Sequence, residues 1–202
     1  MHFHVRLIDN PDTPDLRETS REAHWAYFDD HRDHFIARGA TITDDGKHVL
    51  SSVLWVEFDS FQHVETFIQN EPHNQNKVYK RVEVDFWNCA LNRKQSHFPR
   101  RDGQLVWYIR GYGKLGVNEI RDQLAPAHTS YFRPYDAEHF VVRGGVRSQD
   151  DGPWIGSANL IALPSREDVD AFLRAEPFYS SGLYSDVIVE RYKFGGRPGQ
   201  IA

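Results

Sequence analysis

The sequence predicts an α+β fold in which one small module occurs twice, head to tail. Identical residues recur at a nearly fixed spacing: Arg6 returns as Arg110, and His24 returns as His128. Self-similarity spread over a whole module is the signature of a tandem repeat. Between the copies, residues 96–103 are polar and contain a proline and a glycine, which is typical of a linker. We therefore expect module 1 at 1–95, module 2 at 104–195 and a tail at 196–202.

Hydrophobic periodicity predicts the elements of the first module in order. Alternation over 3–8 indicates a strand, and apolar spacing over about 15–37 indicates a helix that ends at Gly39 as a C-cap. A short strand at 41–42 and a Val- and Leu-rich strand at 49–58 follow. Ser60 then opens a helix that runs to 68. A last strand covers 78–87.

The second module repeats this order, with strands at 105–110, 144–148, 155–163 and 186–194 and helices at about 117–142 and 165–175. The order β-α-β-β-α-β is that of a ferredoxin-like module. Helices cover one face of such a four-stranded sheet and leave the other face bare. We therefore expect the two modules to pack sheet to sheet, as an intramolecular pseudo-dimer.

Composition excludes several classes of function. The chain has 202 residues and a net charge of −5, with no basic stripe, so nucleic acid is not an expected partner. No apolar run is long enough to span a membrane, and the N-terminus lacks the pattern of a signal peptide. A single cysteine, Cys89, excludes an intramolecular disulfide and favours a cytoplasmic location.

Two motifs resemble those of the YCII-related family. The first copy carries a D-x-P segment at Asp9, followed by the R-x-x-x-R-x-x-H pattern of Arg17, Arg21 and His24. The second copy carries the later motif: Gly156-Ser157, Glu176-Pro177-Phe178 and Gly182-Leu183-Tyr184. The resemblance covers nearly the whole chain. It implies a tandem, fused member of the dimeric α/β barrel superfamily.

Each copy departs from the family pattern in a different place. The second copy has no Asp-x-Pro segment and has Ala125 near the position that matches Arg21, so that Arg121 and His128 alone persist from the early motif. The first copy lacks the aromatic residue and the glycine of the later motif. Both copies have Glu-Pro where the family has Asp-Pro. We expect an asymmetric protein whose fuller polar site lies in the first half, and whose second half supplies an interface wall or a second site of altered specificity.

His24 is the predicted general acid or base, because an imidazole can exchange a proton near neutral pH. Asp9 is the predicted orienting carboxylate. The resemblance implies the same pair, since relatives include a dehydrochlorinase acting on a chlorinated hydroxyhydroquinone for which a His–Asp pair is the proposed machinery. The alternative is that His24 is a structural histidine, and its recurrence as His128 fits either interpretation.

Arg17 and Arg21 lie four residues apart and share a predicted helix face with His24, where guanidinium groups could hold a carboxylate or phenolate. A solvated salt-bridge face with nearby glutamates is the alternative. The substrate-binding residues predicted by these patterns and the resemblance are Arg17, Arg21, Ser52, Arg121, His128, Ser157 and Phe178. The other histidines match no metal-site spacing, and no phosphate loop, nucleophile elbow or dinucleotide fingerprint is present, so we expect neither a metal nor a cofactor.

Three functions remain open from the sequence. The first is a cofactor-independent lyase or isomerase, dehydrochlorinase-like or lactone-isomerase-like, that acts on a small aromatic or cyclic acid. The second is a non-catalytic small-molecule-binding accessory protein. The third is a cofactor-free monooxygenase. In each case the expected partner is a small, aromatic or anionic molecule, not a nucleic acid or a membrane, and the protein is a monomeric pseudo-dimer or a homodimer.

Overall fold

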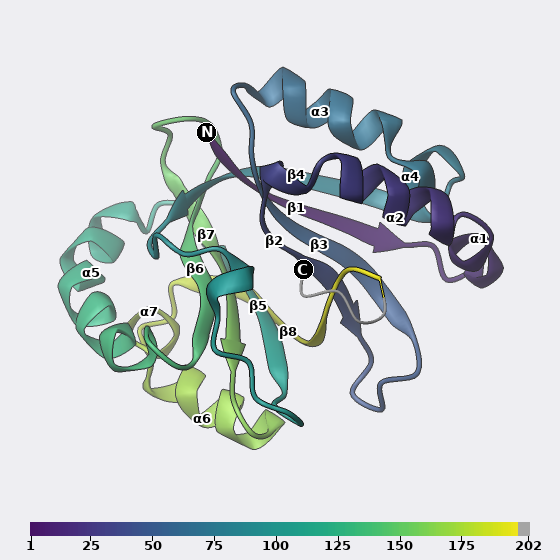
Figure 1. Cartoon of the computed structure of the whole chain (residues 1–202). Coiled ribbons are helices and arrows are strands. Elements are labelled where there is room, and N and C mark those ends of the chain that lie inside the picture. The colour runs from purple at the N-terminus through teal and green to yellow at the C-terminus, as the bar shows by residue number, and fades with distance from the viewer. Residues whose placement is uncertain (198–202) are drawn as a thin grey trace.

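The computed structural model, described for residues 1–197, is a closed barrel of eight antiparallel strands (Figure 1). The first half of the chain supplies β1 (His2–Asp9), β2 (Phe35–Ile42), β3 (Val49–Glu57) and β4 (Tyr79–Cys89). The second half supplies β5 (Val106–Gly113), β6 (Phe140–Arg147), β7 (Trp154–Ala162) and β8 (Tyr184–Phe194). The strand order around the barrel is β1-β3-β2-β8-β5-β7-β6-β4. A mixed α/β fold with antiparallel strands is thus confirmed.

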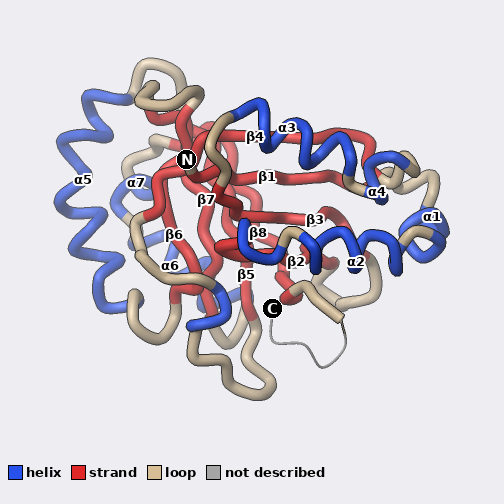
Figure 2. Tube along the Cα trace, turned by 45° about the horizontal axis from the view of Figure 1, so that its top comes forward, coloured by secondary structure: helices blue, strands red, loops and turns tan. Residues whose placement is uncertain are grey.

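The helices lie outside the barrel, where each group covers the strands of its own half (Figure 2). The first half has α1 (Pro14–Thr19), α2 (Arg21–Asp30), α3 (Phe61–Asn70) and α4 (Pro72–Gln75). The second half has α5 (Asn118–Phe132), α6 (Arg166–Ala175) and α7 (Pro177–Ser180). Three short 3-10 turns lie at Arg32–His34, Gln95–His97 and Arg133–Tyr135. Ser60 and Ser165 cap α3 and α6 by accepting hydrogen bonds from backbone amides three residues later.

Edge-to-edge hydrogen bonding joins the two halves at two places. β2 pairs with β8, and β4 pairs with β6. Strand pairing therefore continues around the whole barrel and leaves no sheet edge open within residues 1–197. Closure in this way removes the unpaired backbone groups that an edge strand presents.

The predicted first helix is corrected at both its middle and its end. It breaks at Ser20 into α1 and α2 and ends at Asp30, and β2 begins at Phe35. Gly39 is not a C-cap; it lies within β2, where a Cβ would overlap the Lys193 carbonyl and the Tyr192 ring of β8. The glycine therefore serves the close approach of the two halves. The second predicted helix is corrected in the same way, since α5 ends at Phe132 and Gly144 lies in β6 against β4.

Alternation along β1 separates two environments. Phe3, Val5 and Leu7 are buried against the helices of the first half. His4 and Arg6 lie on the other face of β1 and are buried as well. The Tyr108 hydroxyl lies 2.9 Å from Nε2 of His4, and Arg6 donates a hydrogen bond to Glu190 at 2.8 Å. These contacts cross from one half of the chain to the other.

The ion pair of Arg110 with Asp85 also crosses between the halves, at 3.1 Å, and mirrors the pair of Arg6 with Glu190. Both arginines are buried, so each relies on a carboxylate from the other half. Within residues 1–197, no helix combines the length and the apolar character needed to cross a membrane. The predicted tail at 196–202 lies mostly outside the described residues, which end at 197.

Candidate functional site

Two pockets lie at equivalent places in the two halves. The first-half pocket has a volume of about 330 Å³; Arg17, Arg21, His24 and Ser52 line it, together with Lys193–Gly196 from the end of β8. The second-half pocket has a volume of about 550 Å³; its wall includes Arg121, His128, Ser157 and Phe178, together with Asn88–Ala90 from the end of β4. Each pocket is therefore completed by the last strand of the other half, which requires the closed barrel.

A histidine–glutamate pair lies in the first-half pocket. The Nδ1 atom of His24 is 2.6 Å from Oε1 of Glu71, a fully buried carboxylate. Glu71 also caps α4, accepting hydrogen bonds from the backbone amides of His73 at 3.0 Å and Asn74 at 2.9 Å. An ionised carboxylate only accepts hydrogen bonds, so His24 donates its Nδ1 proton. Its Nε2 atom is the nitrogen left for a ligand in the pocket that His24 lines.

Asp9, the predicted partner of His24, is bound elsewhere. Its two carboxylate oxygens accept from Arg17, with Nε to Oδ2 at 2.7 Å and Nη2 to Oδ1 at 2.6 Å. The prediction that Asp9 orients His24 is wrong in this respect: Glu71, which is 47 residues away in sequence, occupies that position. The signal that could have revealed it was the recurrence of Glu-Pro at Glu71 and Glu176.

The guanidinium group of Arg17 also binds Ser52, whose hydroxyl accepts a hydrogen bond from Nη2 at 3.1 Å. The same hydroxyl lies 3.1 Å from the Tyr79 hydroxyl. The positive charge of Arg17 is balanced by a bidentate carboxylate, an arrangement with high geometric specificity. Arg21 donates to Glu18 at 2.6 Å near the surface, as in the salt-bridge alternative, while it also lines the pocket.

His73 stacks on His24, with ring centroids 4.0 Å apart and planes only 7° from parallel. Its Nδ1 atom lies 2.7 Å from the Ser20 hydroxyl, which also donates to the Leu16 carbonyl. Burial lowers the pKa of His73 to about 2, and the neighbouring charges of His24 and Arg17 act in the same direction. His73 is therefore a neutral imidazole at physiological pH.

His24, Glu71 and His73 bring potential metal ligands within 4.8 Å of one another. A zinc ion lies in the plane of each histidine ring, about 2.1 Å from its nitrogen. Two nearly parallel rings whose centroids are 4.0 Å apart cannot both direct an in-plane lone pair at one ion. Glu71 is moreover already committed to two backbone amides and to His24. These residues do not fit a metal site.

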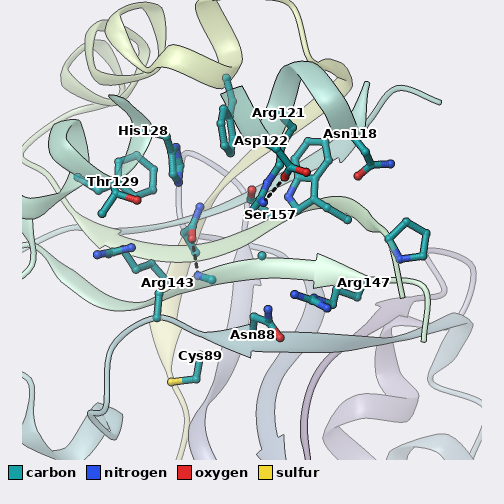
Figure 3. Close-up of a pocket in the computed structure, with 18 of the residues that line it drawn as sticks. Asn88, Cys89, Asn118, Arg121, Asp122, His128, Thr129, Arg143, Arg147 and Ser157 are labelled. Atoms are coloured by element: carbon teal, nitrogen blue, oxygen red, sulfur yellow. Dashed lines mark hydrogen bonds and ion pairs between the residues drawn. The ribbon is translucent and has the colours of Figure 1, made fainter. Parts of the chain in front are cut away.

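The second-half pocket, in which Figure 3 shows His128, repeats the same pair. The Nδ1 atom of His128 lies 2.6 Å from Oε1 of Glu176, and Glu176 caps α7 through the amides of Phe178 and Tyr179. Phe178 stacks on His128 at 4.0 Å, in the place that His73 takes in the first half. The residues predicted from the sequence are thus distributed over two pockets, and they do not form one shared site.

Sequence reasoning missed several residues of these pockets. Glu71 and Glu176 hold the histidines, while Arg38, Arg143 and Arg147 bring further charge to the walls. The recurrence of Arg38 as Arg143 was visible in the repeat, but nothing in the local pattern distinguishes a pocket arginine from a surface one.

Comparison with known proteins agrees with this fold. A model of the YCII-related domain matches residues 1–88 and again residues 105–193. The chain therefore belongs to the YCII-related family and carries its domain in tandem, as the sequence motifs indicated. Among curated proteins, no sequence matches the chain.

Solved structures with this barrel include chlorite dismutase from Candidatus Nitrospira defluvii in complex with imidazole, with 10% identity and a TM-score of 0.60 over 95% of this chain and 91% of that one. An anthrone oxidase-like protein is similar over 100% of this chain and 95% of its own, with 10% identity and a TM-score of 0.58. The 5-chloro-2-hydroxyhydroquinone dehydrochlorinase of Burkholderia phenoliruptrix AC1100, in complex with 2,5-dihydroxybenzoquinone, is aligned over 46% of this chain and 100% of its own, with 23% identity and a TM-score of 0.42. At such identities the first two similarities show a common fold alone.

Proposed function

We propose that the protein is a cofactor-independent lyase or isomerase that moves a proton on a small cyclic or aromatic acid in the first-half pocket. The observation that carries this proposal is the buried pair of His24 with Glu71, which leaves Nε2 of His24 as the nitrogen for a ligand in a pocket of about 330 Å³. Such a volume lies near the lower end of the range for small-molecule sites and suits a single ring.

Glu71 has two roles in this proposal. Its carboxylate accepts the Nδ1 proton of His24, which fixes the tautomer with a basic Nε2. When Nε2 takes a proton from a substrate carbon, the carboxylate stabilises the imidazolium that forms. His24 then returns the proton to another substrate atom in an isomerisation, or keeps it while a leaving group departs with the bond electrons in an elimination.

The walls of the pocket suit an anionic ring. Trp25 and Phe28 offer aromatic faces, and Arg21, Arg38 and Lys193 bring positive charge. Arg38 is 3.4 Å from Asp29, so its pairing is looser than the bidentate pair of Arg17 with Asp9. Arg17 serves the site by holding Ser52 and the end of β1, since its fork is already occupied. An aromatic or lactone acid would place its ring on Trp25 and its carboxylate toward these cations.

We also propose that each half is a ferredoxin-like module and that the two act as an intramolecular pseudo-dimer. Support comes from the repeated order of elements and from the two pockets, each of which needs the last strand of the other half. A cytoplasmic location stays a prediction from the single cysteine.

Proton abstraction can be tested without knowledge of the product. The protein would be incubated in D₂O with a panel of hydroxybenzoates and five-membered lactone acids, and the loss of each C–H signal would be followed by NMR. We expect catalysed exchange for at least one compound. The rate should fall by about 10²–10⁴-fold in His24→Gln, because the general base is removed, and strongly in Glu71→Gln, because the amide no longer fixes the tautomer.

His63→Gln is the matched control, because His63 is an exposed histidine of the same half, on α3. Exchange that survives in His24→Gln, or that falls equally in His63→Gln, would contradict the proposal. Binding of panel compounds, seen as shifts of the His24 ring signals, with no exchange of any C–H group would instead favour the accessory binding protein.

A further inference from the structure

The second-half pocket differs from the first at one position that controls charge. Gly113 takes the place of Asp9: Asp9 is paired with Tyr79 at the end of β1, and Gly113 is paired with the equivalent Tyr184 at the end of β5. The Trp154 ring occupies the space beside Gly113, where a Cβ would meet it at 2.6 Å. The second half therefore has an indole where the first half has a carboxylate.

Arg121, the counterpart of Arg17, loses its buried partner as a result. Its one ion pair among the described residues is with the adjacent Asp122, at 2.8 Å, and the Asp122 side chain is 70% exposed. The buried Nε atom of Arg121 has no hydrogen-bond partner in the described part of the chain. In Arg17, by contrast, Nε and Nη2 each donate a hydrogen bond to a carboxylate oxygen of Asp9. Arg121 thus retains an unsatisfied donor and a weakly balanced charge, and it lies over the Phe178 ring at 5.8 Å.

A second arginine, Arg147, lies on the strand side of the same cavity (Figure 3). Its only carboxylate contact within residues 1–197 is with Asp151, at 3.9 Å, and that side chain is fully exposed. Its other contacts are neutral oxygens: the Gly152 carbonyl, and the Asn88 amide oxygen when the amide is turned toward it. Ion pairs with exposed partners at such distances contribute little.

The other charged residues of the cavity do not balance the positive charges of Arg121 and Arg147. Arg143 is balanced by a bidentate pair with Asp136, at 2.6 and 2.9 Å. Asp122 is the one carboxylate in the wall formed by described residues. The cavity therefore carries an excess of positive charge, and its volume of about 550 Å³ accommodates a small metabolite.

We propose that the second-half pocket is a separate binding site for a small molecule that carries a carboxylate or a phosphate, held between Arg121 and Arg147 beside His128. From the cavity that Arg121 lines, the oxyanion would supply the negative charge that Asp9 supplies to Arg17 in the first half. The apolar part of the ligand would contact Trp154 and Phe178, which line the same cavity. The two pockets thus bind different ligands. In the first, Asp9 of the chain itself pairs with Arg17, and in the second the ligand supplies the oxyanion for Arg121.

The test is isothermal titration with inorganic phosphate and, separately, with benzoate, at low ionic strength. The two titrations distinguish a phosphate site from a carboxylate site, and saturable binding of either one is required. We expect Arg121→Gln and Arg147→Gln each to weaken binding by about tenfold or more, as the loss of a charge-assisted hydrogen bond does. Asp122→Asn should tighten binding several-fold, because it removes the competing carboxylate, and a folding defect cannot imitate a gain.

Arg166→Gln is the matched control, because Arg166 is a surface arginine of α6 whose ion pair with Asp170 is far from this cavity's lining. Its titration should equal that of the wild-type protein. Equal affinity in wild type, Arg121→Gln and Arg147→Gln, or an equal loss in Arg166→Gln, would overturn the proposal. So would the absence of saturable binding for both probes. Circular dichroism of each variant verifies that it is folded.

Discussion

Replacing His73 with phenylalanine should make the protein more resistant to acid. His73 is almost completely buried, and burial lowers the pKa of its imidazole to about 2. Phe178 occupies the equivalent place in the second half. Leu124, the counterpart of Ser20, packs against the cluster of which Phe178 is a part. A phenylalanine is therefore compatible with this stack on a histidine ring.

The magnitude follows from the difference between the folded and unfolded pKa. The ordinary pKa of histidine is 6.5, so between pH 6.5 and pH 2 the unfolded chain binds a proton at His73 that the folded chain does not. Stability contributed by the neutral imidazole is complete above pH 6.5 and decreases as the pH falls, by about 1.4 kcal/mol per pH unit. At pH 4.5 the loss is about 3 kcal/mol, a large part of the 5–15 kcal/mol that is typical of folded proteins. In His73→Phe this loss is absent.

Urea unfolding at pH 7, 6, 5 and 4.5 measures the effect as the free energy of unfolding of each protein. The difference between His73→Phe and wild type should grow in favour of the variant as the pH falls below 6.5. His63→Gln serves as the control, since it removes an exposed histidine from the same half of the chain. If wild type and His73→Phe lose stability in parallel from pH 7 to pH 4.5, His73 is protonated in the folded protein and the reasoning fails.

Two further perturbations test the contacts that distinguish the halves. Asp9→Ala should destabilise the protein by about 1–3 kcal/mol, because it removes the carboxylate that accepts from the mostly buried guanidinium of Arg17. Added benzoate should restore part of the melting temperature, and an unchanged melting temperature would contradict the pairing. Gly39→Ala should cost about 1–3 kcal/mol in urea unfolding, since its Cβ overlaps β8; Gly103→Asn, at an open position with φ of 74°, should change little.

Much of the fold could be predicted from local patterns. Alternation, residue content and turn signals identified all four strands of the first half at least in part, and Ser60 marked the start of α3. The end of the first helix was predicted too late in the sequence, because Phe35 and Ile36 suit either the apolar face of a helix or a buried strand. Gly39 misled for a related reason: a glycine after apolar residues is typical of a C-cap, and its actual neighbours lie more than 150 residues away.

The sequence predicted residues of the candidate site but not which acid pairs with His24. His24, Arg17 and their counterparts do line pockets. Asp9 and Glu71 are both acids within reach of the motif, and sequence spacing cannot decide which of them meets the imidazole. Glu71 does so because α4 begins beside α2, and the same carboxylate caps that short helix.

From the sequence alone one can read that a module is repeated, which strands and main helices each copy contains, and which histidine and arginine recur in both. These properties follow from periodicity and identity along the chain, which folding does not alter. The three-dimensional arrangement adds that strand pairing closes the barrel and that each copy completes the pocket of the other. It also shows that the carboxylate partner of Arg17 is mostly buried, whereas that of Arg121 is exposed. The physical reason is that the balance of a charge depends on which groups surround it in space. Contacts such as those of Gly39 with β8, or of Trp154 beside Gly113, exist only after the strands have paired.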